Sequence, residues 1–298
     1  MTEHIESTER IDESLPMSSD TGTGAGTVFA ASSARAAASG PPTPAYVYAI
    51  GRVEPRFPSL AIEKEFAQIL SRGDTTGITD REALQQTLAN RANRYLARSL
   101  CWVFLVEGLE TYALVPRDPV DLDLLIDAVR VDPQPVDVDV IVGQRGPIAP
   151  PEMCGGLNTP VVFFEHIWSF PRDALLAAIP RPEGMDDERF ATMAGELFNR
   201  LMQLADNAGA TDQHRALNYL AVRYPAIYVR TAEAYTSNAS LSAVEVRPSS
   251  LTGVRNIVDV IFAYTHRETD VTERHFVRVD VTEQFPFLVS RLSPFYSH

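Results

Sequence analysis

The order of the strand-like and helix-like segments is the feature that most restricts how this chain can fold. The clearest β signal is CWVFLVEGLETYALVP, which predicts paired strands at residues 101–106 and 111–115 around a turn near Gly108. The clearest helical periodicity runs over residues 186–209 and stops at Gly209. Because strands and helices do not alternate regularly as in a parallel α/β fold, the sequence predicts an α+β fold.

The C-terminal part of the sequence predicts a run of strands. ASLSAVEVRP, RNIVDVIFAYT and TERHFVRVDVT each have strand-like patterns, and the last two flank HRETDV. We therefore expect a mixed sheet with an antiparallel C-terminal hairpin and several packed helices.

The first 44 residues differ in composition from the rest of the chain. They are rich in Ser, Thr, Ala and Gly and end in GPPTP, so they predict a disordered N-terminal tail before a domain at residues 45–298. Within them, TGTGAGT has the glycines of a phosphate loop. No strand precedes it and no Lys follows it, so a linker is the better interpretation.

Charge and composition exclude several classes of function. The formal net charge of −13 argues against nucleic-acid binding, since an acidic chain repels phosphates. No apolar run is long enough to predict a membrane span, and the N-terminus does not resemble a secretory signal. Two cysteines give no disulfide framework, so a cytoplasmic location is expected.

The stretch TDQHRALNYLAVRYP predicts a polar helix capped by Thr211 or Asp212. His214 and Asn218 lie one turn apart on a flank of its apolar face, while Arg215 lies further round. The two flanking residues predict either a polar seam on a half-buried helix or the rim of a binding site. The seam is the simpler interpretation.

The segment GQRGPIAPPEMCGGL predicts a proline-rich loop with two candidate residues. Arg145 between glycines is suited to binding a carboxylate, or to pairing with a nearby acid. Cys154 is a possible nucleophile or zinc ligand, with His214 and one further His as weak partners. No signature surrounds it, and an inert, half-buried thiol is favoured, so no cofactor is predicted.

Two other polar patterns have structural explanations. Asp137 and Asp139 alternate with valines, which is typical of a half-solvated strand although paired carboxylates can also bind Mg²⁺. His275 shares a strand face with Val277 and Val279, which favours a core histidine over a ligand.

Long segments of the chain resemble a known family. They include YVYAIGRVEPRFPSLAIEKEFAQ, NRYLARSLCWVFLVEGLETYALVPRDP, RALNYLAVRYPAIY and NASLSAVEVRPSSLTGVRNIVDVIFAYTHRETDVTE. The chain is similar over nearly all of residues 45–296 to the C-terminal domain of unknown function of cyanobactin maturation proteases, the patellamide macrocyclase and leader-protease family. In that family this domain follows a subtilisin-like domain, whose Ser, His and Asp signatures are missing from this sequence.

The resemblance implies a setting in the biosynthesis of ribosomally made, modified peptides. We expect an accessory, non-catalytic protein that binds a precursor peptide or a co-encoded enzyme, without nucleic acid or membrane partners. Two alternatives stay open: a peptide-modifying enzyme of unassigned reaction, with Cys154 and His214 to test first, and a structural domain that forms homo-oligomers.

Overall fold

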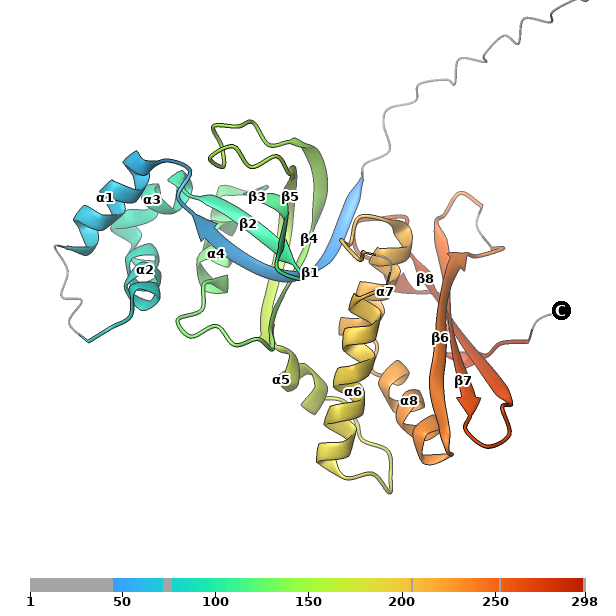
Figure 1. Cartoon of the computed structure of the whole chain (residues 1–298). Coiled ribbons are helices and arrows are strands. Elements are labelled where there is room, and N and C mark those ends of the chain that lie inside the picture. Colours follow the sequence, from blue (N-terminus) through green and yellow to red (C-terminus); the bar gives the residue numbers. More distant parts are fainter. Residues whose placement is uncertain (1–44, 72–76, 205, 252, 297–298) are drawn as a thin grey trace, which may run out of the picture. The chain divides into compact units, whose positions relative to one another are not determined.

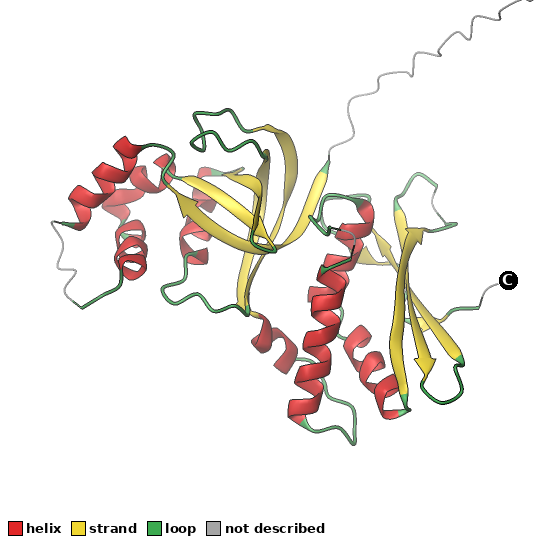
Figure 2. Cartoon of the chain, in the orientation of Figure 1, coloured by secondary structure: helices red, strands yellow, loops and turns green. Residues whose placement is uncertain are grey.

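The N-terminal part of the chain is a closed five-stranded barrel (Figures 1 and 2). A computed structural model describes residues 45–71, 77–204, 206–251 and 253–296. The barrel strands, in spatial order, are β1 (Tyr46–Arg56), β2 (Cys101–Val106), β3 (Leu109–Pro116), β5 (Pro160–Pro171) and β4 (Asp137–Ile148). Only the β3–β5 pair is parallel among these neighbours. This order is that of the oligonucleotide- and oligosaccharide-binding (OB) fold, a small Greek-key barrel.

Strand β1 closes the barrel by pairing with two neighbours. Its first half pairs with β4 and its second half with β2, and the change of partner falls at Gly51. A Cβ atom at Gly51 would collide with the Leu105 carbonyl oxygen, so only glycine fits at this crossing. The predicted strands at residues 101–106 and 111–115 are confirmed as β2 and β3.

Alternation along the strands divides the apolar side chains of the barrel into three groups. The inward group joins the helices α1 (Leu60–Leu70), α2 (Asp80–Ala89), α3 (Arg94–Ser99) and α4 (Leu122–Ala128) in one core. The outward group of β1 and β4, which we call the helical face, consists of Tyr48, Ile50, Val140 and Val142. The outward group of β2, β3 and β5, the strap face, consists of Cys101, Val103, Leu105, Ala113, Val115 and Val161.

The helical segment between β1 and β2 differs from its prediction. The sequence predicts one long helix after Asp80, but α2 ends at Ala89 and a 3-10 turn, Arg91–Asn93, precedes α3. Asn90 is the break: its backbone is extended, and its side chain accepts a hydrogen bond from the Ala92 amide at 3.0 Å. An Asn side chain that caps a new turn competes with continuation of the old helix. A second 3-10 turn, Pro119–Asp121, leads into α4.

The C-terminal part packs helices against an antiparallel sheet (Figure 1). The helices are α5 (Arg172–Ala177), α6 (Asp187–Met202), α7 (Asp212–Arg223) and α8 (Ala226–Thr236). The sheet has the order β10 (Ser293–Pro294), β8 (Thr272–Asp280), β7 (Ile257–His266) and β6 (Ala239–Pro248), and β9 (Phe287–Leu288) also pairs with β8. The predicted α+β class and the antiparallel hairpin, β7–β8, are confirmed.

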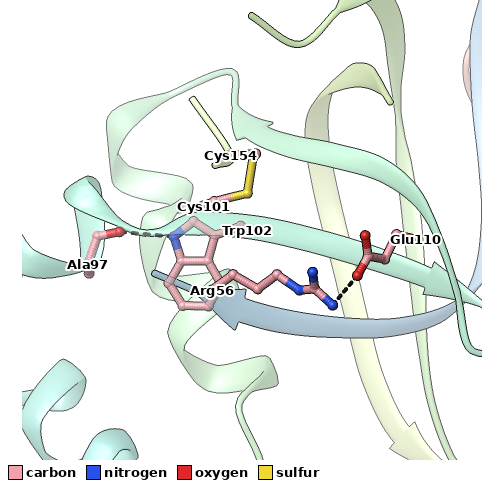
Figure 3. Close-up of a disulfide and its surroundings, with 6 residues drawn as sticks. All are labelled: Arg56, Ala97, Cys101, Trp102, Glu110 and Cys154. Carbon is pink, nitrogen blue, oxygen red and sulfur yellow. Dashed lines mark hydrogen bonds and ion pairs between the residues drawn. A yellow bond between two sulfur atoms is a disulfide. The ribbon is translucent and has the colours of Figure 1, made fainter. Parts of the chain in front are cut away.

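Residues 149–159, which we call the strap, cross the strap face of the barrel. The predicted loop begins later than expected, because β4 continues through Arg145 to Ile148. Ala149 donates its amide to the Thr159 carbonyl at 2.8 Å and so closes the base of the strap. Cys154 forms a disulfide with Cys101 at the start of β2, with 5.1 Å between the Cα atoms (Figure 3).

Two predictions concern other parts of the chain. The tail at residues 1–44, with its TGTGAGT segment, lies outside the described residues. In the described ranges, no helix has the length and apolar character needed to cross a membrane.

Candidate functional site: an aromatic–arginine pocket

Helix α7 is the element that organises the candidate site. Thr211 is its N-cap, and the Thr211 Oγ1 accepts a hydrogen bond from the His214 amide at 3.1 Å. The helix ends at Arg223, just before Pro225. Leu217 and Leu220 are buried in the C-terminal core, which is continuous with the helical face of the barrel. The helix therefore lies at the junction of barrel and sheet.

Arg215 fixes the segment that follows β8 beside α7. Its side chain is 3% exposed, and the guanidinium donates to the carbonyl oxygens of Val281, at 2.6 Å, Glu283 and Gln284, at 3.3 Å. Burial lowers the pKa of Arg215, and the negative charge of Asp212 opposes that shift. This arginine has an anchoring role, because its donors are directed at backbone groups that have no strand partner.

Asn218 joins α7 to the barrel. Its Nδ2 donates to the Tyr48 carbonyl at 2.8 Å, and its Oδ1 accepts from Asn207 Nδ2 at 2.6 Å. Beside it, the Tyr48 amide donates to the Gly209 carbonyl at 2.9 Å. Asn218 is fully buried, and both ends of its amide are used inside the structure, which favours the polar seam over the rim of a binding site.

A hollow of about 370 Å³ opens next to these links. Its residues come from four separate segments of the chain: Tyr48, Trp168, Tyr219, Arg223, Phe285 and Pro286. The Arg223 guanidinium carbon lies 4.5 Å from the centre of the Trp168 ring, and Tyr48, Phe285 and His166 also contact that indole. We call this site the aromatic–arginine pocket.

The polar groups of the pocket have few acidic or hydrogen-bonding partners among the described residues. None of the six described lining residues is acidic. Among the described residues no ion pair of Arg223 is recorded, and the buried Tyr48 hydroxyl has no hydrogen bond of good geometry. Burial raises the pKa of Tyr48 to about 12, although the positive charge of Arg223 and a weak hydrogen-bonding interaction with that side chain lower the pKa in part. Tyr48 therefore remains a neutral hydroxyl that can still donate or accept one bond.

This arrangement can bind an anion beside an apolar group. A guanidinium stacked on an indole keeps its in-plane N–H donors free, and these match the two oxygens of a carboxylate. The surrounding rings offer apolar faces to neighbouring groups of a ligand.

Of the residues predicted for a site, Arg145 is exposed on β4, and no acidic partner is recorded for it within the described ranges. Its role in binding a carboxylate stays a prediction. His214 is a half-buried residue of the first turn of α7, and it does not line the aromatic–arginine pocket.

The interpretation of Cys154 as a free thiol is wrong. Its sulfur is bonded to Cys101, so it is neither a nucleophile nor a thiolate ligand in this state. Across the described parts of the chain, no three His, Cys, Asp or Glu side chains come together as a metal site would require. The weak zinc site of Cys154 and His214 is therefore not formed.

The two aspartates of β4 are not on a solvated face. Asp137 and Asp139 are both buried and both pair with Arg130, and Asp139 Oδ2 accepts from the Val53 amide at 2.7 Å. Burial raises the pKa of Asp139, and Arg130 opposes that shift. His275, predicted to be a core residue, is half-buried against Tyr264; burial and then Arg230 lower its pKa.

The sequence predicts the helix of the candidate site but not the side of the helix that lines the pocket. Tyr219 and Arg223 lie one and two turns after Arg215 in the same stretch, and this i, i+4 spacing was a usable signal. Tyr48, Trp168 and Phe285 carried no signal, because only the folded chain brings them together.

The site thus belongs to an α+β protein in which an OB-type barrel and a helix-covered sheet share one core. Residues 184–295 match the family model described as PatG C-terminal. The fold is similar to a solved structure titled "PatG Domain of Unknown Function", with a TM-score of 0.68 and 22% identity over 84% of this chain and 98% of that one. A search of curated proteins gave no match. The predicted resemblance to this C-terminal domain is confirmed.

Proposed function

We propose that this protein is a non-catalytic accessory protein of a cyanobactin-like pathway and that it binds a precursor peptide in the aromatic–arginine pocket. The observation that carries the proposal is the exposed residue Arg223, whose guanidinium stacks on Trp168 in a hollow with no acidic residue among its described lining residues. The match of residues 184–295 to PatG C-terminal supports the pathway setting.

The ligand chemistry follows from the charges around the pocket. In a chain with a net charge of −13, an arginine without a recorded acidic partner is a specific attraction for a carboxylate, not part of a general basic surface. We expect Arg223 to bind a carboxylate of the peptide, from an acidic side chain or the C-terminus. The Tyr48 hydroxyl would supply a further hydrogen bond, and Phe285 and Tyr219 would cover an adjacent apolar residue.

The test is calorimetric titration with the precursor peptide encoded beside this chain. Versions of the peptide with single Asp→Asn or Glu→Gln changes, and one with a C-terminal amide, identify the bound carboxylate. Arg223→Gln is expected to weaken binding roughly 10- to 100-fold, the value of one charge-assisted hydrogen-bonded contact. Arg267→Gln is the matched control, because Arg267 also stacks on a ring, that of Tyr235, outside this pocket. Arg145→Gln tests the remaining predicted contact.

The outcomes separate the proposal from its alternatives. Equal affinity for all peptide versions, or equal binding by the Arg223→Gln variant and wild type, would refute the pocket as the binding site. Mass spectrometry of the incubated peptide should show an unchanged mass. A changed mass would make this protein an enzyme and would overturn the accessory role.

A further inference from the structure

The strap face of the barrel is a covered apolar surface away from the aromatic–arginine pocket. Val103, Ala113 and Val161 are buried beneath the strap, and Leu105 and Val115 are partly buried at its margins. The strap itself contributes Ala149, Cys154, Met153 and Leu157 to this small cluster. The cluster is separate from the two larger cores, so it does not depend on them for its apolar contacts.

The strap is held on this face by few interactions other than the disulfide. Its recorded backbone hydrogen bonds join strap residues to one another: Met153 to Pro150 at 3.0 Å, Gly156 to Pro151 at 2.7 Å and Leu157 to Cys154 at 3.3 Å. Most of its residues are exposed. A segment that satisfies its own backbone groups can leave the face without leaving many buried polar groups unpaired.

The position of this face in the barrel is informative. It lies on β2, β3 and the start of β5, between the β1–β2 connection and the strap, which is the β4–β5 connection. OB-type barrels bind extended oligomers on this face, between these two loops. Here the face is lined by aliphatic side chains on an acidic protein, which by chemistry fits an extended apolar peptide and not a nucleic acid.

We propose that the Cys101–Cys154 disulfide is a latch that keeps the strap over a second peptide-binding surface. A dithiol reductant opens the latch: one of its thiolates attacks the sulfur of Cys154, Cys101 leaves as a thiolate, and the second thiol releases Cys154 as the reductant closes to a disulfide. Two electrons pass to the protein, and both cysteines become thiols. The strap then moves off, and a separate apolar peptide segment of similar chemistry takes its place.

The first test is hydrogen exchange of the full chain before and after treatment with dithiothreitol. Faster exchange is expected within residues 149–159 and on β2, while α6, α7 and β7 keep their protection. The Cys101→Ala, Cys154→Ala double variant should show the same pattern without reductant. Unchanged protection of the strap in both would overturn the latch, and so would uniform loss of protection, which would make the disulfide a general stabiliser.

The second test is binding of a labelled synthetic peptide that copies residues 148–160 with the change Cys154→Ser. The tethered strap competes with this probe at a high effective concentration even when reduced. The expected affinities therefore rise from oxidised wild type to reduced wild type to the reduced Met153→Ser, Leu157→Ser variant, by at least about tenfold overall. Leu105→Gln in that last variant should remove binding, whereas Arg223→Gln should not. Equal binding in all redox states would contradict the proposal.

Discussion

The two outer faces of the same barrel are covered in different ways. The helical face is covered by α6 and α7, and its side chains belong to a core that reaches β7 and β8. The strap face is covered by an irregular segment that joins only a small cluster and is tied down by one covalent bond. Helices satisfy their own backbone groups and bury a continuous apolar stripe, whereas a loop buries little and gains from a cross-link.

The largest difference between the two faces is expected from removing one leucine on each side. Leu220→Ala, at a fully buried position of α7, should lower the free energy of unfolding by about 2–5 kcal/mol. Leu157→Ala, at a half-buried position of the strap, should cost less than about 1.5 kcal/mol with the disulfide intact. Urea denaturation of both variants measures this. Equal losses would show that the strap is as integral to the core as α7.

Two glycines with positive φ, one beside each face, allow a second comparison of how tightly the two covers are packed. Gly209, with φ of 74°, packs so closely on β1 that a Cβ atom would collide with the Tyr48 carbonyl oxygen, whereas Gly156 in the strap, with φ of 92°, faces open space. Gly156→Ala should lower the free energy of unfolding by the backbone strain alone, about 1 kcal/mol. Gly209→Ala adds the collision and should lower it by about 2–3 kcal/mol. Thermal unfolding of the two variants should give this order. A larger loss for Gly156→Ala would contradict it.

The smallest expected effect concerns how stability depends on pH, to which two buried aspartates should contribute in opposite directions. Asp280, which precedes the segment held by Arg215, has a lowered pKa: burial alone would raise it, but hydrogen bonds from Thr282 and Arg255 outweigh that effect. A carboxyl whose pKa is lowered on folding stabilises the protein above the pKa of the unfolded chain, and this contribution is lost as pH falls through the lower, folded value. Asp280→Asn should therefore reduce the loss of stability in acid.

Asp139 in the barrel is expected to change the pH dependence of stability in the opposite direction. Its pKa is raised on folding, so its contribution becomes unfavourable as pH rises from the ordinary aspartate value through the folded one. Denaturation midpoints between pH 3 and 7 should therefore respond in opposite directions to Asp280→Asn and Asp139→Asn. The same response from both variants would contradict these assignments.

Local patterns were sufficient to predict many elements of this fold. The pair β2–β3, the hairpin β7–β8 and the cap and end of α7 follow from alternation, turn residues and Thr211. The closure of the barrel was not predicted, because it depends on β1 changing partner at Gly51 and on β3 lying parallel to β5. Neither leaves a local signal in the sequence.

The site was predicted less well, for the same physical reason. Asp137 and Asp139 alternate with valines as on a solvated strand, but Arg130 from a neighbouring loop buries and neutralises them. Cys101 and Cys154 are 53 residues apart, and only the folded strap brings them together. The sequence predicts Asn218 beside the apolar face of α7. It does not predict that the Asn218 side chain donates to a carbonyl on the first strand, that of Tyr48.

The hydrogen bond from Asn218 to Tyr48 joins residues that are 170 positions apart. During synthesis, β1 leaves the ribosome long before α7 exists, so the helical face must stay uncovered while most of the chain is still being made. A nascent chain that ends before α6 therefore exposes Tyr48, Ile50, Val140 and Val142 to other proteins. The residues that match PatG C-terminal therefore bury the helical face of the barrel only late in synthesis. Premature termination early in this segment is expected to give an aggregation-prone product.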